Sequence, residues 1–141
     1  VYDNEMVVFT GGGNGPFYGL EMKATTQESI FYVQAILNHW LMERLVKSKA
    51  STFRGDYYSH GKQFIATLPI YKIDFDNPTE VAKHQDIVDS VRTIMDLKNR
   101  IRNAPNTTQR NTLERAVAGA IRALNGKIDR LYQVNAQEDE E

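Results

Sequence analysis

The segment Thr52 to Phe64 reads TFRGDYYSHGKQF and gathers side chains that could contact a charged, flat ligand. Arginine and lysine bind phosphate oxygens, and arginine is the usual bidentate partner of guanine in the major groove. Hydroxyl, imidazole and amide groups can hydrogen-bond bases or phosphates, and glycine lets the backbone approach closely. The residues that carry these properties are Arg54, Gly55, Tyr57, Tyr58, Ser59, His60, Gly61, Lys62 and Gln63. This segment is therefore the first candidate for a contact with DNA.

Charge is distributed unevenly around this segment. The chain has 17 basic and 18 acidic residues and a net charge of -1, and four acids end it at 138–141. Between residues 43 and 72, six basic residues stand against two acidic ones, a local charge of +4. Lys47 and Lys49 belong to this basic stretch. With Arg54 and Lys62, they are predicted to contact phosphates and position a duplex.

The two adjacent tyrosines leave two interpretations open. Successive side chains of an extended segment point to opposite faces, so one of Tyr57 and Tyr58 should reach a ligand and the other the core. Base contacts would then come from Arg54, the tyrosines, His60 or Gln63, with Asn14 in the glycine-rich stretch 11–19 a weaker candidate. The alternative is a polar surface connection with one buried tyrosine.

No catalytic or metal-binding constellation stands out. His39, His60 and His84 are widely separated and form no H-E-x-x-H motif, and the chain lacks cysteine. Asp74 and Asp76 precede a helix start, where acids favour the helix dipole. The glycine-rich stretch lacks the Gly-Lys-Ser/Thr ending of a phosphate loop and the dinucleotide spacing. No apolar run reaches the roughly 20 residues that a membrane helix needs.

The surrounding pattern predicts an α+β fold. The expected strands and loops are a strand at 5–10, the glycine-rich loop at 11–19, an extended segment at 53–59, a helical turn at 61–67 and an edge strand at 68–73. Thr25 and Glu28 have the spacing of a capping box, which predicts one helix from there to Lys49. Its expected apolar face comprises Ile30, Val33, Ile36, Leu37, Trp40, Leu41 and Leu45.

Two further helices are expected in the second half of the chain. Asn77 and Pro78 mark the start of a helix that runs to about Asn103. Its apolar stripe is Ile87, Val91, Ile94 and Ile101, with Val88 and Met95 beside it. A helix over 108–134 follows, with a stripe of Leu113, Val117, Ile121, Leu124, Ile128 and Leu131. A short turn between them predicts an antiparallel helical hairpin.

Three parts of the chain are distinguished. Residues 1–75 form a small α+β part of a DNA recognition domain, residues 76–134 the helical hairpin, and residues 135–141 a disordered acidic tail. The chain begins at Val1 in strand-like sequence. We therefore interpret it as a fragment whose recognition domain is truncated on its N-terminal side.

The order of these motifs resembles the C-terminal target recognition (specificity) domain of TaqI-like N6-adenine DNA methyltransferases and type II restriction-modification enzymes. Between residues 11 and 132 the similar stretches are, in order, GGGNGPFYGL, FYVQAILNHWLMERLVK, STFRGDYYSHGKQFIATLPI, HQDIVDSVRTIMDLKNRI and KIDRLY. Specificity subunits of type I restriction systems share the layout of Leu-Pro-Ile and a long helix. Tyr71 stands where the family usually has a second proline, and the catalytic Asn-Pro-Pro-Tyr/Phe motif has no match.

The resemblance implies a non-catalytic module that binds double-stranded DNA and sets sequence specificity. Its expected partners are duplex DNA and the catalytic methyltransferase or nuclease domain of the same chain, in a prokaryotic cytoplasm. S-adenosylmethionine is expected in that missing catalytic domain, and no cofactor or membrane in this fragment. The alternative is a helical protein-interaction or dimerisation module of a restriction-modification complex. A free-standing enzyme has no constellation to support it.

Overall fold

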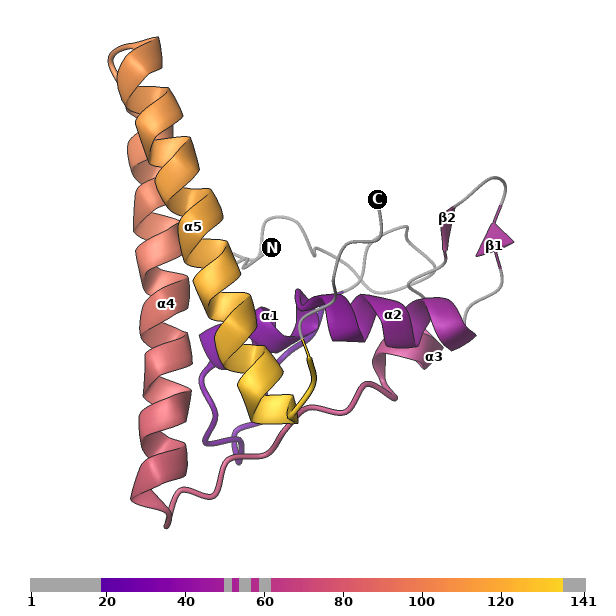
Figure 1. The fold of residues 1–141 in the computed structure, drawn as a ribbon. Coiled ribbons are helices and arrows are strands. Elements are labelled where there is room, and N and C mark those ends of the chain that lie inside the picture. Colours follow the sequence, from indigo (N-terminus) through magenta and orange to yellow (C-terminus); the bar gives the residue numbers. More distant parts are fainter. Residues whose placement is uncertain (1–18, 50–51, 54–56, 59–61, 136–141) are drawn as a thin grey trace.

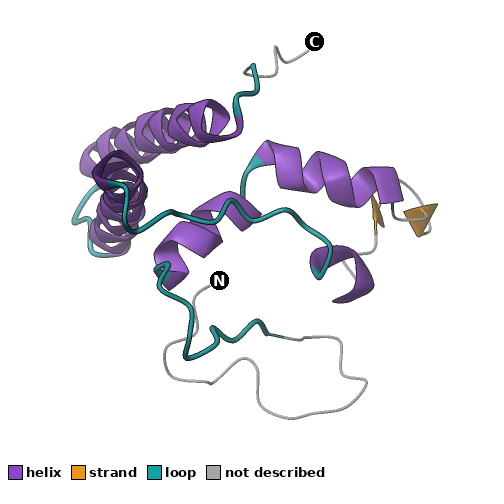
Figure 2. Cartoon of the chain, turned by 90° about the horizontal axis from the view of Figure 1, so that it is seen from below, coloured by secondary structure: helices purple, strands orange, loops and turns teal. Residues whose placement is uncertain are grey.

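Two long helices dominate the computed structural model, which describes residues 19–49, 52–53, 57–58 and 62–135. α4 (Pro78–Arg102) and α5 (Thr107–Tyr132) run antiparallel and are joined by a short turn (Figure 1). α1 (Ile30–Leu37) lies across the hairpin near the start of α4, and α2 (Trp40–Lys49) extends away from it (Figures 1 and 2). β1 (Thr52–Phe53), β2 (Tyr57–Tyr58) and α3 (Lys62–Ile65) lie at the far end of α2.

The predicted helical hairpin is confirmed. The side chain of Asn77 caps α4 by accepting a hydrogen bond from the Thr79 amide at 3.0 Å, and Pro78 occupies the first turn. Asn106 caps α5 in the same way through the amide of Gln109. α5 closes at Gln133, whose left-handed backbone (φ 54°) lets the Val134 amide reach back to the carbonyl of Asp129.

The two apolar stripes meet inside the chain, but not at every predicted position. The buried members are Ile87, Val88, Val91, Ile94, Val117, Leu124, Ile128 and Leu131. Met95 and Ile121 are instead 39% and 38% exposed. Both lie in the half of the hairpin that extends beyond α1, where the two helices alone cannot cover every side chain of a stripe.

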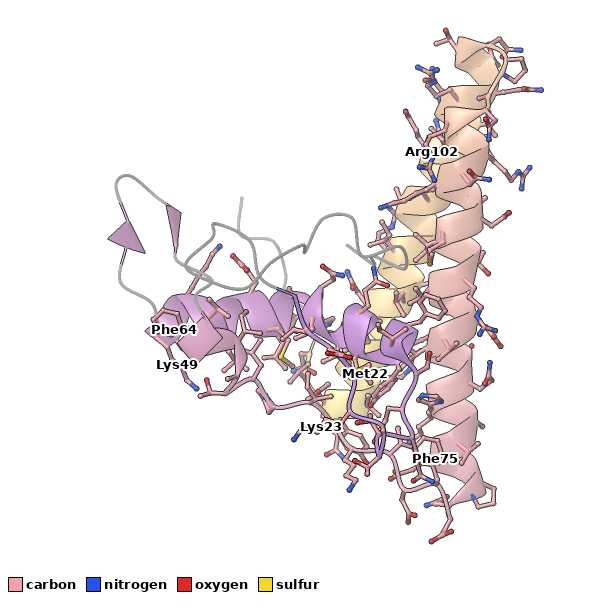
Figure 3. All side chains as sticks on the ribbon, turned by 180° about the vertical axis from the view of Figure 1, so that it is seen from behind. Met22, Lys23, Lys49, Phe64, Phe75 and Arg102 are labelled. Carbon is pink, nitrogen blue, oxygen red and sulfur yellow. The ribbon has the colours of Figure 1, made fainter. Side chains whose placement is uncertain are left out.

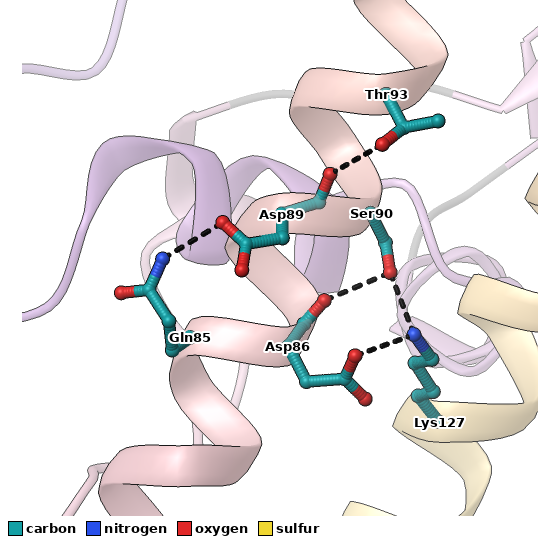
Figure 4. A network of polar contacts seen from close by, with 6 residues as sticks. All are labelled: Gln85, Asp86, Asp89, Ser90, Thr93 and Lys127. Atoms are coloured by element: carbon teal, nitrogen blue, oxygen red, sulfur yellow. Dashed lines mark hydrogen bonds and ion pairs between the residues drawn. The ribbon is translucent and has the colours of Figure 1, made fainter.

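Polar contacts on the side of the hairpin shown in Figure 4 connect α4 to α5. The Lys127 ammonium donates to the Asp86 carboxylate and to the Ser90 hydroxyl, both at 2.8 Å. The Ser90 hydroxyl itself donates to the carbonyl of Asp86. The Asp86 side chain is more than half exposed, so this ion pair adds little stability.

The helix predicted from residue 28 to Lys49 is two helices. Ser29, not Thr25, is the N-cap of α1, and its hydroxyl accepts a hydrogen bond from the Phe31 amide at 3.2 Å. The helix is interrupted at Asn38 and His39, and α2 begins at Trp40. The break rotates the buried face, so Tyr32, Ala35, Ile36, Met42 and Val46 are buried. Of the predicted apolar face only Ile36 is fully buried.

The predicted α+β class is wrong for the described residues, which are mainly helical. Their only sheet is the antiparallel pair of β1 and β2, in which Thr52 faces Tyr58 and Phe53 faces Tyr57. The short helix α3 confirms the predicted turn at 61–67. The predicted strand at 5–10 and residues 11–18 of the glycine-rich loop lie outside the described residues.

The edge strand predicted at 68–73 is an extended segment without a strand partner. Side chains take its backbone groups instead: the Tyr71 amide donates to the Tyr132 hydroxyl at 2.8 Å, and the Ile73 amide donates to Glu28 at 3.1 Å. The hydroxyls of Tyr132 and Tyr32 donate to the carbonyls of Pro69 and Tyr71. A strand-like sequence therefore forms no ladder, because side chains of α1, α5 and a loop bond several of its backbone groups.

One hydrophobic cluster joins these elements. Its buried members come from α1, α2, α4, α5 and the extended segment, which contributes Ile73. The domain boundaries at residues 75 and 134 stay predictions. None of the described helices combines the length and apolarity that crossing a membrane requires.

Candidate nucleic-acid interface

The segment singled out in the sequence lies at the end of the molecule farthest from the helical hairpin (Figure 1). Residues 54–56, which include Arg54, join the two short strands, and Tyr57 and Tyr58 form β2. Lys62 and Gln63 open α3. Arg54, His60 and Asn14 lie outside the described residues, so their predicted contacts stay predictions. The backbone thus brings the predicted DNA-contacting residues 57, 58, 62 and 63 to one end of α2.

Lys47 and Lys49 also lie at this end, in the last turn of α2. The Lys47 ammonium is 3.5 Å from the Glu43 carboxylate, and both side chains are about half exposed (48% and 44%). The Lys49 ammonium donates to the Thr67 hydroxyl at 3.3 Å and thereby ties α2 to the turn after α3. Figure 3 shows Lys49 beside Phe64 of α3. Lysines in a last helical turn also complement the helix dipole, so their position alone has a structural explanation.

A second concentration of positive charge, which the sequence analysis missed, lies on the half of the hairpin beyond α1. Between residues 98 and 122 there are six basic residues and one acid, Glu114. The basic residues are Lys98, Arg100, Arg102, Arg110, Arg115 and Arg122, and all six are exposed. The signal was available in the sequence as a local charge of +5 over residues 98–122.

The two described histidines are buried, and both have structural contacts. His39 is fully buried, and its Nε2 lies 2.8 Å from Oδ1 of Asp129. Its Nδ1 accepts a hydrogen bond from the Leu41 amide at 3.2 Å, so Nε2 carries the proton and donates to Asp129. The same carboxylate oxygen accepts from Nε1 of Trp40 at 3.0 Å. His39 therefore caps α2 and fastens it to α5.

This His–Asp pair does not have the arrangement of a catalytic dyad. A carboxylate orients a catalytic imidazole when the second ring nitrogen is free to take a proton from a nucleophile. In His39 that nitrogen is occupied by a backbone amide, and the ring is inaccessible to solvent. In the part of the chain that the structure describes, no three His, Asp or Glu side chains gather as a metal site would require. Asp74 accepts from the Asp76 amide, which is the turn before α4.

His84 is the second buried histidine, and it predicts a pH dependence of stability. Its Nε2 accepts a hydrogen bond from the Ser29 amide at 3.0 Å, which only the neutral ring can do. Burial lowers the pKa of His84 below its ordinary 6.5, and the nearby Glu28 carboxylate opposes this only in part. The unfolded chain therefore binds this proton more tightly, so the contribution of neutral His84 is complete above pH 6.5. It is lost as the pH falls below that value.

Urea unfolding of the chain at pH 7.5 and pH 5.5 measures this loss. We expect the midpoint to fall at the lower pH, and the fall to shrink in a His84→Gln variant, whose amide oxygen can still accept from Ser29. The other histidines are present in both proteins, so their contribution cancels in the comparison. An unchanged pH dependence in the variant would contradict the assignment.

Comparisons with known proteins give one informative similarity. No family model matches the chain, and no solved structure matches it significantly. The chain is 29% identical, over 85 residues, to the type II restriction enzyme and methyltransferase RM.Eco57I of Escherichia coli. The match covers 60% of this chain and 8% of that protein. The chain is therefore similar to a small part of a restriction-modification enzyme.

Proposed function

We propose that the chain is a non-catalytic DNA target recognition module of a restriction-modification enzyme, an adenine-specific DNA methyltransferase alone or fused to a nuclease. The observation that carries the proposal is the similarity to RM.Eco57I, whose description joins restriction and methylation in one protein. The basic residues gathered at the end of α2 support it, because phosphate contacts supply most of the sequence-independent affinity for DNA.

In this proposal, one end of the molecule faces the duplex. Lys47, Lys49, Arg54 and Lys62 contact phosphates and set the register. Arg54, Tyr57, Tyr58, His60 and Gln63 read base edges, with Asn14 as a further contact. α2 and α3 hold this end together through Lys49 and Thr67, which gives the reading residues a rigid base.

The chemistry of methyl transfer lies outside this module in the proposal. S-adenosylmethionine belongs to a catalytic domain elsewhere in the parent chain, in the cytoplasm of a prokaryote. The function proposed for this chain uses none of that cofactor's chemistry.

Binding of short duplexes by the 141-residue chain over a salt series tests the proposal. We expect affinity to fall steeply with salt. In Arg54→Ala/Lys62→Ala we expect a weaker dependence, with the slope of log K against log salt reduced by about 1.8 for two lost phosphate contacts. Lys23→Ala/Lys83→Ala removes two exposed lysines far from β1 and β2 and serves as the matched control. Equal slopes for the two variants would count against the proposed loop.

A protein-interaction module is the second candidate, and one groove favours it. Trp40, Leu41 and Leu45 on one side of α2 line an open groove with Val134 after α5. The hairpin stripes give this candidate little support, since most of their members are buried within the chain and only Met95 and Ile121 are exposed. Light scattering separates the two: a monomer that binds duplex DNA supports the recognition module, and a dimer indifferent to DNA supports the interaction module.

A further inference from the structure

The half of the hairpin beyond α1 carries basic side chains that have no acidic partner among the described residues. Two described lysines elsewhere form ion pairs, Lys127 with Asp86 and Lys47 with Glu43. Among the described residues, the six exposed basic side chains between residues 98 and 122 form no ion pair. Their arrangement on the two helices identifies which of them share a surface.

On α4 the side that faces α1 is marked by two contacts. His84 accepts from Ser29 at the start of α1, and the Arg92 guanidinium lies 5.6 Å from the centre of the Phe31 ring. Steps of three and four residues from His84 stay on one side of a helix. They lead through Val88, Val91 and Met95 to Lys98 and Arg102. Figure 3 shows Arg102 on the side of the hairpin where α1 and α2 lie.

On α5 the corresponding side is marked by Asp129, which contacts His39 and Trp40 at the start of α2. Residues seven apart lie on nearly the same side of a helix, since 3.6 residues make one turn. Arg122 and Arg115 stand seven and 14 residues before Asp129. Lys98, Arg102, Arg115 and Arg122 therefore line one surface, which we call the inner face of the hairpin.

None of the four residues of the inner face has an acidic neighbour on its own helix that could neutralise its charge. No acid stands three or four residues before or after any of them, the positions from which a helical neighbour could form an ion pair. Lys98 and Arg102 are themselves four residues apart, and like charges at this spacing destabilise a helix. Glu114 is adjacent in sequence to Arg115 and is thus directed about a quarter turn away. A bound polyanion would remove this repulsion.

We propose that the inner face of the hairpin binds the phosphate backbone of duplex DNA. The inference rests on the proposed function, but it places a second contact surface far from the segment at 52–64. Arg115 and Arg122 are about 10.5 Å apart along α5. Two arginines at this spacing reach different phosphates of a duplex, whose charges follow one another about every 1.7 Å along its axis. Ala118 and Gly119 lie between the two arginines, and the Arg122 guanidinium reaches over Gly119, where a Cβ would lie 3.9 Å from Nη2.

Duplex DNA fits this face better than an acidic protein segment does. Three of the four residues are arginines, whose planar guanidinium matches phosphate geometry. Asn99 and Asn111 nearby are exposed and offer neutral donors of the kind that accompany phosphate contacts. An acidic helix or strand usually brings apolar contacts as well, and Met95 and Ile121, 39% and 38% exposed, are the only exposed large apolar side chains of the described hairpin.

The test is duplex binding by the full chain and by Arg102→Ala/Arg115→Ala/Arg122→Ala, across a salt series and with two 24-base-pair duplexes of unrelated sequence. All three sites are exposed and alanine favours helix, so circular dichroism should show an unchanged fold. We expect affinity at about 0.1 M salt to fall about tenfold or more, and the salt slope to drop by about 2.7. Both duplexes should lose affinity equally, because phosphate contacts carry no sequence information.

A matched pair of single variants controls for net charge. Arg102→Ala lies on the inner face, and Arg100→Ala, two residues away, lies on nearly the opposite side of the same helix. Only Arg102→Ala should weaken binding. Equal losses of affinity in these two single variants would overturn this inference. An unchanged affinity of the triple variant would also overturn it, and the proposed function would stand if Arg54→Ala/Lys62→Ala still lost affinity.

Two further outcomes are decisive. If the unmodified chain binds neither duplex at low salt, both the inference and the proposed function fail. If poly-glutamate competes as well as duplex at equal charge, the inner face is a site for acidic protein and the DNA assignment is wrong. If unlabelled duplex competes and poly-glutamate at equal charge does not, the DNA assignment is supported.

Discussion

Replacing Asp129 by alanine should lower the free energy of unfolding by about 2–5 kcal/mol. One oxygen of this carboxylate accepts from Nε2 of His39 at 2.8 Å and from Nε1 of Trp40 at 3.0 Å. His39 is fully buried and Asp129 is 8% exposed, so the ring N–H groups of His39 and Trp40 could not both find water as a replacement acceptor. The loss would also loosen the junction of α1 and α2, because the imidazole that caps α2 would no longer be held.

Asp86→Ala is the matched control for Asp129→Ala. It removes the same kind of side chain from an ion pair that connects α4 to α5, but Asp86 is 59% exposed and its partner Lys127 can be hydrated. We expect a cost of about 0.2–1 kcal/mol. Asp129→Asn keeps an acceptor oxygen and should cost less than alanine. Urea unfolding of the three variants measures the differences, and similar costs for the two alanine variants would refute the importance of the buried cluster.

Replacing Ile128 by alanine should cost about 2–5 kcal/mol of stability. Ile128 is fully buried where α5 meets the cluster formed by α1, α2 and α4. Removal of its terminal carbons leaves a cavity that elements held by Asp129, Tyr132 and Lys127 cannot readily collapse to fill. Thermal and urea unfolding should report the same loss, with the helical content of the folded state unchanged.

Ile121 provides an internal control seven residues earlier on the same helix. The two isoleucines occupy the same apolar stripe in the sequence, but Ile121 is 38% exposed. Ile121→Ala should therefore cost less than about 1 kcal/mol, because little buried surface is lost and alanine favours helix. Comparable losses at both positions would mean that the distal half of the hairpin is packed against a further part of the chain.

The long helices were predictable because the signals that form them are local. Asn77 and Pro78 start α4, Asn106 caps α5, and the apolar spacing of three and four residues needs no distant information. The helical turn predicted at 61–67 corresponds to α3. The basic character of the segment at 43–72 was likewise visible in the sequence.

Tertiary contacts decided the features that the sequence analysis missed. The helix through residues 28–49 breaks at His39 because its imidazole has a partner 90 residues away in Asp129. The segment at 68–73 has the composition of a strand, yet two of its amides donate hydrogen bonds to the side chains of Glu28 and Tyr132, which come from distant parts of the chain. Side chains so far apart in sequence leave no periodic pattern, so no local rule could have paired them.

The candidate surfaces divide in the same way. The sequence by itself determined which residues are basic, where the long helices begin and end, and which residues lie three or four apart along them. Only the tertiary structure decided that α1 and α2 cover one side of the hairpin near its base and that the side chains continuing along that side are Lys98, Arg102, Arg115 and Arg122. A helical period shows which residues share a side, but which side faces a neighbour depends on where distant elements pack.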